Sequence, residues 1–126
     1  MRLILDAGAL VAVELANREV VALIKRELTA GRAPVTHGGV VGQVWRGGSG
    51  RQAPLARLLP GLEIVGIDEA LGRRAGLLLG KARLSDVVDA TLVALAADGD
   101  SVLTSDVQDL RRLVEAADTH VDLVPV

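Results

Sequence analysis

The sequence predicts an α/β fold in which a central parallel sheet is covered by helices on both faces. Short runs of Leu, Val and Ile recur along the chain, and stretches with helical features separate them. Strands that alternate with helices are typical of parallel sheets that are buried on both sides. At 126 residues the chain has the usual size of one domain. We therefore assign residues 1–126 to a single α/β domain.

Five apolar segments have the length and the aliphatic character of buried strands. The third of them is "LEIVGI" and the fourth is "SVLT". The predicted strands are residues 2–5, 33–36, 62–67, 101–104 and 120–126.

The segments between these strands are predicted as helices. In residues 18–31 apolar side chains recur at helical spacing, and a closing glycine is placed to end the helix. Pro54 suits a first helical turn. Asp68 is placed to cap one helix, and Ser85 or Asp86 to cap another. The predicted helices are residues 8–16, 18–31, 37–47, 55–59, 69–82, 87–99 and 106–117.

The composition limits the classes of protein and site. Trp45 is the only aromatic residue, and the absence of cysteine excludes disulfides and thiolate metal sites. A net charge of −2 argues against a uniformly basic nucleic-acid binder. Asp6 and Glu14 interrupt the apolar N-terminus, which favours a strand and a helix over a secretion signal. No uncharged run reaches the roughly 18 residues of a membrane span. We expect a cytoplasmic protein without a membrane segment.

Aspartates stand at positions where a parallel sheet would bring them together. Asp6 directly follows the first strand and Asp106 follows the fourth, and functional groups of such sheets gather beyond the carboxyl ends of strands. Asp109, Asp86 and Asp89 stand near the starts of predicted helices. Aspartate is also a favoured N-cap residue, so that Asp86 and Asp106 could simply cap their helices.

Asp6 and Asp89 are less easily explained as caps because apolar segments surround both of them. Burying an unpaired charge is costly, so each needs a cation or a set of hydrogen-bond donors. Several carboxylates without cysteine favour a hard divalent ion, Mg²⁺ or Mn²⁺. The pattern therefore predicts a metal site at the carboxyl end of the sheet.

Four segments together resemble a PIN domain, and more narrowly the small VapC-type ribonuclease toxins. They are "LDAGALVAV", "VVGQVWRG", "LSDVVDATLVALA" and "VLTSDVQDL", which follow one another in the order that the family shows and span nearly the whole chain. Each segment is a weak signal alone, whereas the four in order make a fairly specific one.

The resemblance implies a role for individual residues. Asp6, Asp89 and Asp106 match the family's catalytic acids, and with Asp109 they would be the metal ligands. Gln43 stands where the family usually carries a glutamate, so it offers a carbonyl oxygen but no charge. Further neighbours of the implied site are Asp86, Thr104 and Ser105.

The implied activity is metal-dependent hydrolysis of RNA, by the toxin component of a type II toxin–antitoxin pair. Family relatives imply a homodimer and an antitoxin protein as partner. Arg46 and Arg51 flank a glycine-rich loop near Gln43 and are the best candidates for RNA contacts, although scattered arginines are usually plain surface residues. The alternative is a catalytically weak or inactive PIN-like module that binds RNA or protein. Gln43 is the reason to consider it.

Other α/β classes fit less well. A phospho-receiver domain would place an acidic pair after the first strand, whereas this chain has Asp6 alone. The first turn, "DAGALVA", lacks the glycine pattern of dinucleotide binders, and "GGSG" at 47–50 lacks the Lys-Ser/Thr of a phosphate loop. His37 and His120 have no metal-ligand spacing, and we assign no role to either.

Overall fold

A computed structural model describes residues 1–126 and shows a five-stranded sheet in the order β3-β2-β1-β4-β5, with every neighbouring pair parallel. The strands are three or four residues long, and Asp6, His37 and Asp106 cap the helices that follow β1, β2 and β4. They are β1 (Leu3–Leu5), β2 (Val35–His37), β3 (Glu63–Val65), β4 (Ser101–Thr104) and β5 (Asp122–Pro125).

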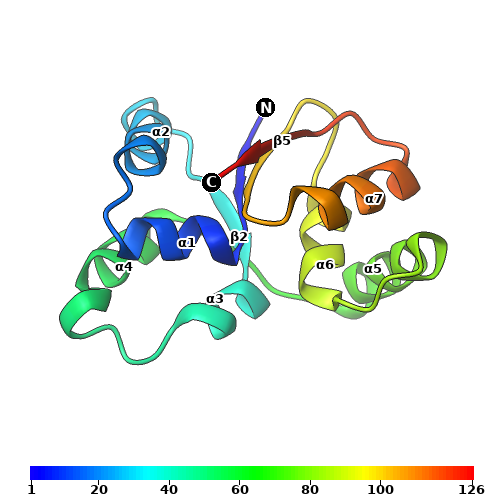
Figure 1. The fold of residues 1–126 in the computed structure, drawn as a ribbon, viewed down its shortest axis with the longest axis horizontal. Helices are drawn as coiled ribbons and strands as arrows, with labels where there is room; N and C mark the ends of the chain where they lie inside the picture. The colour runs from blue at the N-terminus through cyan, green and yellow to red at the C-terminus, as the bar shows by residue number, and fades with distance from the viewer.

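Helices cover both faces of the sheet, as Figure 1 shows. From the central β1 the chain runs to β2 and then to β3 at one edge of the sheet. Helices α1 to α4 cover one face of the sheet. The chain then returns past β1 to β4 and to β5 at the other edge. Helices α5 to α7 cover the opposite face. The helices are α1 (Ala7–Glu14), α2 (Arg18–Thr29), α3 (Gly38–Val44), α4 (Ala53–Leu58), α5 (Glu69–Ala82), α6 (Val87–Leu95) and α7 (Val107–Ala117), with short 3₁₀ turns at Gly50–Gln52 and Leu59–Gly61.

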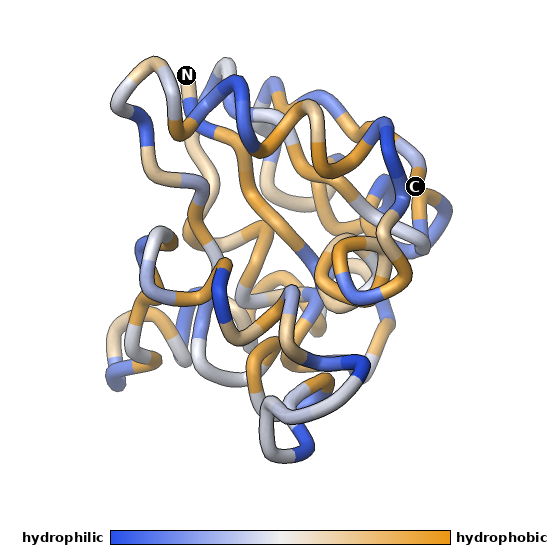
Figure 2. The backbone as a smooth tube through the Cα atoms, turned by 90° about the vertical axis from the view of Figure 1, so that its left-hand side faces the viewer, coloured by the Kyte–Doolittle hydropathy of each residue, from blue (hydrophilic) through white to orange (hydrophobic).

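The core lies around the middle strand. Ile4 of β1 pairs with Val35 of β2 on one side and with Val102 of β4 on the other, and all three side chains are fully buried. Leu10 of α1 and Leu92 of α6 pack into the same aliphatic cluster from the two helical layers. In Figure 2 the apolar stretches run through the interior, while hydrophilic residues gather at many peripheral turns. None of the helices combines the length and the apolar character that crossing a bilayer requires.

Helix caps fall where the sequence places them. Asp68 accepts a hydrogen bond from Leu71 N–H at 2.8 Å, and Asp86, rather than Ser85, caps α6. Helix α6 ends at Leu95, four residues before the predicted end, because the following residues turn back to bond Asp100. His37, predicted to open a helix, instead ends β2 and caps α3. The predicted α/β class with a parallel sheet between two helical layers is confirmed.

Candidate functional site

The carboxyl end of the sheet brings five aspartates into electrostatic range of one another. Asp89, in the first turn of α6, is the one most affected. Burial is the largest cause that raises the pKa of its carboxyl, and together with the negative charges of four other aspartates it brings this pKa to about 7. In decreasing order of effect they are Asp86, Asp106, Asp6 and Asp109. No hydrogen bond or cation offsets this shift, so Asp89 lies in a site of unbalanced negative charge.

Asp6 has a different environment, although it belongs to the same cluster. It is 4% exposed and caps α1, with Oδ1 accepting the Ala9 N–H at 2.9 Å and Oδ2 accepting the Ser105 N–H at 3.2 Å. The carboxylate therefore ties the end of β1 to the loop after β4. Two backbone donors leave further lone pairs on these oxygens, so Asp6 remains able to face a cation.

Close contact between the start of α1 and the loop after β4 supports this arrangement. A side chain at Gly8 would place its Cβ 2.3 Å from Ser105 Oγ, which is far inside a van der Waals contact. The glycine in "DAGA" thus allows the β4–α7 loop to approach the start of α1, where its backbone can reach Asp6. Thr104 ends β4 and its Oγ1 accepts the Asp106 N–H at 2.8 Å. The predicted hydroxyl neighbours hold this loop through Thr104 Oγ1 and the Ser105 backbone.

Three of the aspartates also serve as helix caps. Asp86 accepts hydrogen bonds from the N–H groups of Val88 and Asp89, at 2.9 and 3.1 Å. Asp106 accepts a longer one, of 3.4 Å, from Asp109 N–H. The capping and the clustering interpretations of the sequence are therefore compatible, because the starts of these helices and the carboxyl ends of the strands share one edge of the sheet.

Whether these residues fit a divalent ion can be tested on their chemistry and placement. The donor set is entirely carboxylate, and its mutual repulsion at Asp89 is the kind that a cation relieves. No three Asp, Glu or His side chains converge closely enough in this structure to hold one ion. The charge and the ligand type fit Mg²⁺ or Mn²⁺, while a closed ligand shell is not formed.

Gln43 has a different setting from the five aspartates. It is exposed on α3 and lines a hollow of about 370 Å³ whose other polar residues include Glu14, Arg46 and Arg51. None of the five aspartates lines this hollow. The structure thus groups the predicted basic contacts with Gln43, in a hollow that the aspartates do not line.

The loop that carries Arg46 and Arg51 is held by several hydrogen bonds, although its glycine content predicts a flexible segment. Gln52, which sequence reasoning did not single out, is buried, and its side chain donates to Val44 O at 2.7 Å. Its Oε1 accepts the backbone N–H groups of Arg46 and Gly48. The Arg46 guanidinium turns back to the carbonyls of Gly42 and Trp45. No local sequence pattern reveals Gln52, because its partners are loop carbonyl and amide groups.

His37 is the second residue that sequence reasoning left without a role. It is fully buried, and its ring lies between Gly39 N–H and the carbonyl of Val88 in α6. Burial lowers the pKa of His37, an effect that the hydrogen bond to Val88 partly offsets, so the imidazole is neutral at physiological pH. His120 is exposed and near Asp98, away from these aspartates.

Comparison with known proteins finds a solved structure with a similar fold. No protein-family model matches the chain, and no curated protein matches it in sequence. Among solved structures, a chain in the complex of VapBC2 from Rickettsia felis with a DNA fragment from their promoter superposes with a TM-score of 0.71 at 14% identity. The match covers 98% of both chains. At this identity the likeness shows a shared α/β fold and nothing finer.

Proposed function

We propose that this protein is a metal-dependent endoribonuclease and the toxin component of a type II toxin–antitoxin pair. The observation that carries the proposal is the Asp89 carboxyl, whose pKa burial and four neighbouring carboxylates raise to about 7 at the carboxyl end of the sheet. Such unbalanced charge at the functional edge of an α/β sheet marks a candidate site. The PIN-like fold and its likeness to a chain of a VapBC complex support the same function.

In this proposal Asp6, Asp89 and Asp106 hold Mg²⁺ or Mn²⁺, with Asp109 as a further ligand. A bound divalent ion would supply positive charge for the scissile phosphate and acidify an attacking water. Asp6 is fixed by two backbone donors and gives a preset oxygen position. Asp89 has no such donors, and a cation that offset the charges of its neighbours would favour its deprotonated form. Arg46 and Arg51, beside Gln43, are proposed to contact the RNA backbone.

The proposed partners are an RNA substrate, a second copy of the chain and a cognate antitoxin. The structural relative is described as VapBC2 bound to promoter DNA, which motivates a search for the antitoxin in this case. A small reading frame for a DNA-binding protein next to this gene, whose product co-purifies with the chain, is the expected finding.

A catalytically weak or inactive PIN-like module, which binds RNA or protein, is the second candidate function. Two observations favour it. Gln43 brings no charge where the family usually has glutamate, and no three acidic side chains converge on one point. Incubation of the protein with structured RNA in Mg²⁺, Mn²⁺ or chelator separates the two candidates. Cleavage that depends on metal and is lost in Asp89→Asn supports the nuclease, and RNA binding without cleavage supports the module.

We expect divalent metal to raise the melting temperature. An ion that binds only the folded state at about 100 times its Kd adds about 2.7 kcal/mol, or about 10 °C for a domain of this size. Thermal melts in Mg²⁺, in Mn²⁺ and in chelator measure it. The Asp89→Asn protein serves as control and is expected to respond much less. Three identical curves for the natural protein would argue strongly against a metal site.

Replacing Gln43 with glutamate tests whether this position belongs to the metal site. We expect Gln43→Glu to bind Mn²⁺ about tenfold more tightly, since hard cations prefer charged oxygen. Arg46 and Arg51 line the same hollow, so the added charge should leave the metal-free protein nearly as stable as before. Isothermal titration of Mn²⁺ into both proteins gives the affinities. Equal affinities would place Gln43 outside the site.

A further inference from the structure

His37 connects two elements that are far apart in the sequence. It is the last residue of β2 and the N-cap of α3, and its side chain is fully buried. Nδ1 accepts the Gly39 N–H at 3.1 Å, and Nε2 lies 2.9 Å from the carbonyl oxygen of Val88. Because Nδ1 acts as an acceptor, the proton is assigned to Nε2, which donates to Val88. A single neutral imidazole thus bonds the start of α3 and the first turn of α6.

The surroundings of the ring are shaped to receive it. A Cβ atom at Gly39 would lie 2.9 Å from His37 Cε1, 3.0 Å from Nδ1 and 3.5 Å from Val88 Cγ2. Any side chain at position 39 would therefore press on the ring, which would have to shift. The absence of a side chain here lets the imidazole fold back over the start of α3 while keeping its bond to Val88.

The bonded turn of α6 is the one that carries Asp89. Asp86 holds this turn from within the helix by accepting from Val88 N–H and Asp89 N–H. His37 holds it from the sheet through the Val88 carbonyl, one residue before Asp89. Both contacts therefore engage the peptide unit between Val88 and Asp89, one at its N–H and the other at its carbonyl. Asp89 itself receives no hydrogen bond that would fix its carboxylate, so its position follows from that of the helix.

We propose that His37 is a positioning residue, whose bridge from β2 to the Val88 carbonyl sets the first turn of α6 and places Asp89 against Asp6 and Asp106. Its effect on metal binding and RNA cleavage rests on the proposed function. The bridge itself does not, because it is a property of the fold. Two residues define this bridge: His37 donates the hydrogen bond, and Gly39 leaves room for the ring.

The test uses His37→Asn in the full chain. Asparagine is a good N-cap and retains an acceptor near the place of Nδ1, but its side chain is too short to reach Val88. We expect a folded protein in which the amides of Val88 to Ala90 exchange with solvent about tenfold faster or more, with α5 and α7 unchanged. Titration of Mn²⁺ should show about tenfold weaker binding, and RNA cleavage should lose kcat with KM nearly unchanged.

Two further variants separate positioning from general stability. Ile24→Val removes one buried methyl group from α2, in the other helical layer, and should lower global stability without affecting α6 exchange or Mn²⁺ affinity. Gly39→Ala keeps the imidazole but crowds it, and should reproduce the local changes of His37→Asn. If His37→Asn fails to fold, the Gly39→Ala comparison decides the matter.

The proposal is overturned if α6 exchange and Mn²⁺ affinity in His37→Asn and Gly39→Ala match those of Ile24→Val. A natural protein that neither binds Mn²⁺ nor cleaves RNA would instead refute the proposed function. In that case hydrogen exchange in the first turn of α6 still decides whether His37 holds it.

Discussion

Asp89→Asn is expected to stabilise the metal-free protein by about 2 kcal/mol at pH 8 and to abolish RNA cleavage. The pKa of Asp89 is raised from 3.8 to about 7 by burial and by the charges of four other aspartates. The folded protein therefore binds this proton more tightly than the unfolded chain. Its contribution to stability is complete below the unfolded pKa and is lost as the pH rises through about 7. At 1.36 kcal/mol per unit the loss is at most about 4 kcal/mol, and solvent screening at this partly exposed site should halve it.

Urea unfolding in chelator at several pH values between 4 and 8 measures this difference. The free energies of unfolding of the two proteins should nearly coincide at the acidic end and diverge toward pH 8. Asp122→Asn is a matched control, because it removes the same charge from an exposed position on β5. If the free energies of unfolding of the natural protein and Asp89→Asn changed in parallel with pH, the charge of Asp89 would not destabilise the fold.

The same substitution at Asp6 should have the opposite effect on stability. Asparagine keeps one acceptor oxygen but turns an NH₂ group toward either Ala9 N–H or Ser105 N–H, in a place that is 4% exposed. A buried donor without an acceptor costs about 1–3 kcal/mol. Asp6→Asn is therefore expected to be less stable than the natural protein at every pH, although cleavage is lost in both variants. The two backbone donors at Asp6 account for the difference, because Asp89 has none.

The layout of strands and helices could be predicted from the sequence because local signals determine it. Aliphatic runs mark the strands, and Asp68, Asp86 and Asp106 stand where helices must begin. The gathering of aspartates at one edge follows from the parallel sheet itself, since every strand ends there. Such conclusions need the order of elements and no knowledge of which side chains touch.

What could not be predicted depends on contacts between distant segments. His37 meets a carbonyl 51 residues away, and nothing near it in sequence marks Val88 as its partner. Gln52 bonds only backbone groups of its own loop, which leave no pattern of residue types. Asp100 stands in "DGD", which reads as an ordinary turn, yet it is 2% exposed and bonded to the second residue of the chain.

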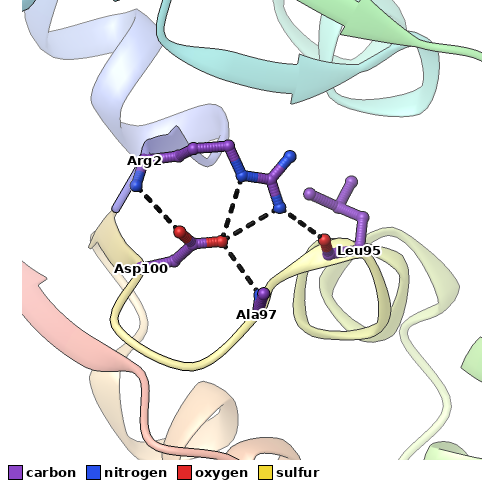
Figure 3. Close-up of polar contacts among 4 residues, drawn as sticks. All are labelled: Arg2, Leu95, Ala97 and Asp100. Atoms are coloured by element: carbon purple, nitrogen blue, oxygen red, sulfur yellow. Dashed lines mark hydrogen bonds and ion pairs between the residues drawn. The ribbon is translucent and has the colours of Figure 1, made fainter.

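The contacts of Asp100 form a network at the amino end of the sheet, drawn in Figure 3. Its Oδ1 accepts the Arg2 backbone N–H at 2.8 Å, and its Oδ2 accepts from the Arg2 guanidinium and from Ala97 N–H. Arg2 also donates to the Leu95 carbonyl at the end of α6. One carboxylate thus joins the starts of β1 and β4 to the end of a helix.

Asp100→Asn is expected to lower the free energy of unfolding by about 3 kcal/mol at pH 7. It removes the charge opposite Arg2 and puts an NH₂ group against at least one donor, and breaking a buried ion pair costs about 3–5 kcal/mol. The lower end applies because the Arg2 side chain is 38% exposed. Urea unfolding at pH 7 gives the value, with Asp122→Asn again as the matched control. A change below about 0.5 kcal/mol, typical of exposed positions, would show that the network adds little.

The dependence on pH distinguishes this network from the aspartate cluster. Burial raises the pKa of Asp100, but the hydrogen bonds from Ala97 and Arg2 and the charge of Arg2 outweigh it, so the pKa is lowered overall. Its contribution to stability is present above the ordinary pKa of 3.8 and is lost as the pH falls through the lowered value. The natural protein should therefore lose this stability only in strong acid, while Asp100→Asn lacks it at every pH.

Combining Asp89→Asn with Asp100→Asn tests whether the two ends of the sheet act independently. Asp100 precedes β4 and Asp106 follows it, so a strand of four residues, at about 3.3 Å each, separates the network from the cluster. Effects at this separation usually add within about 0.5 kcal/mol. The double variant should show the gain of Asp89→Asn near pH 8 and the loss of Asp100→Asn at pH 7. A clear departure from additivity in urea unfolding would mean that α6 transmits strain between them, since it carries Asp89 in its first turn and Arg2 bonds its last residue.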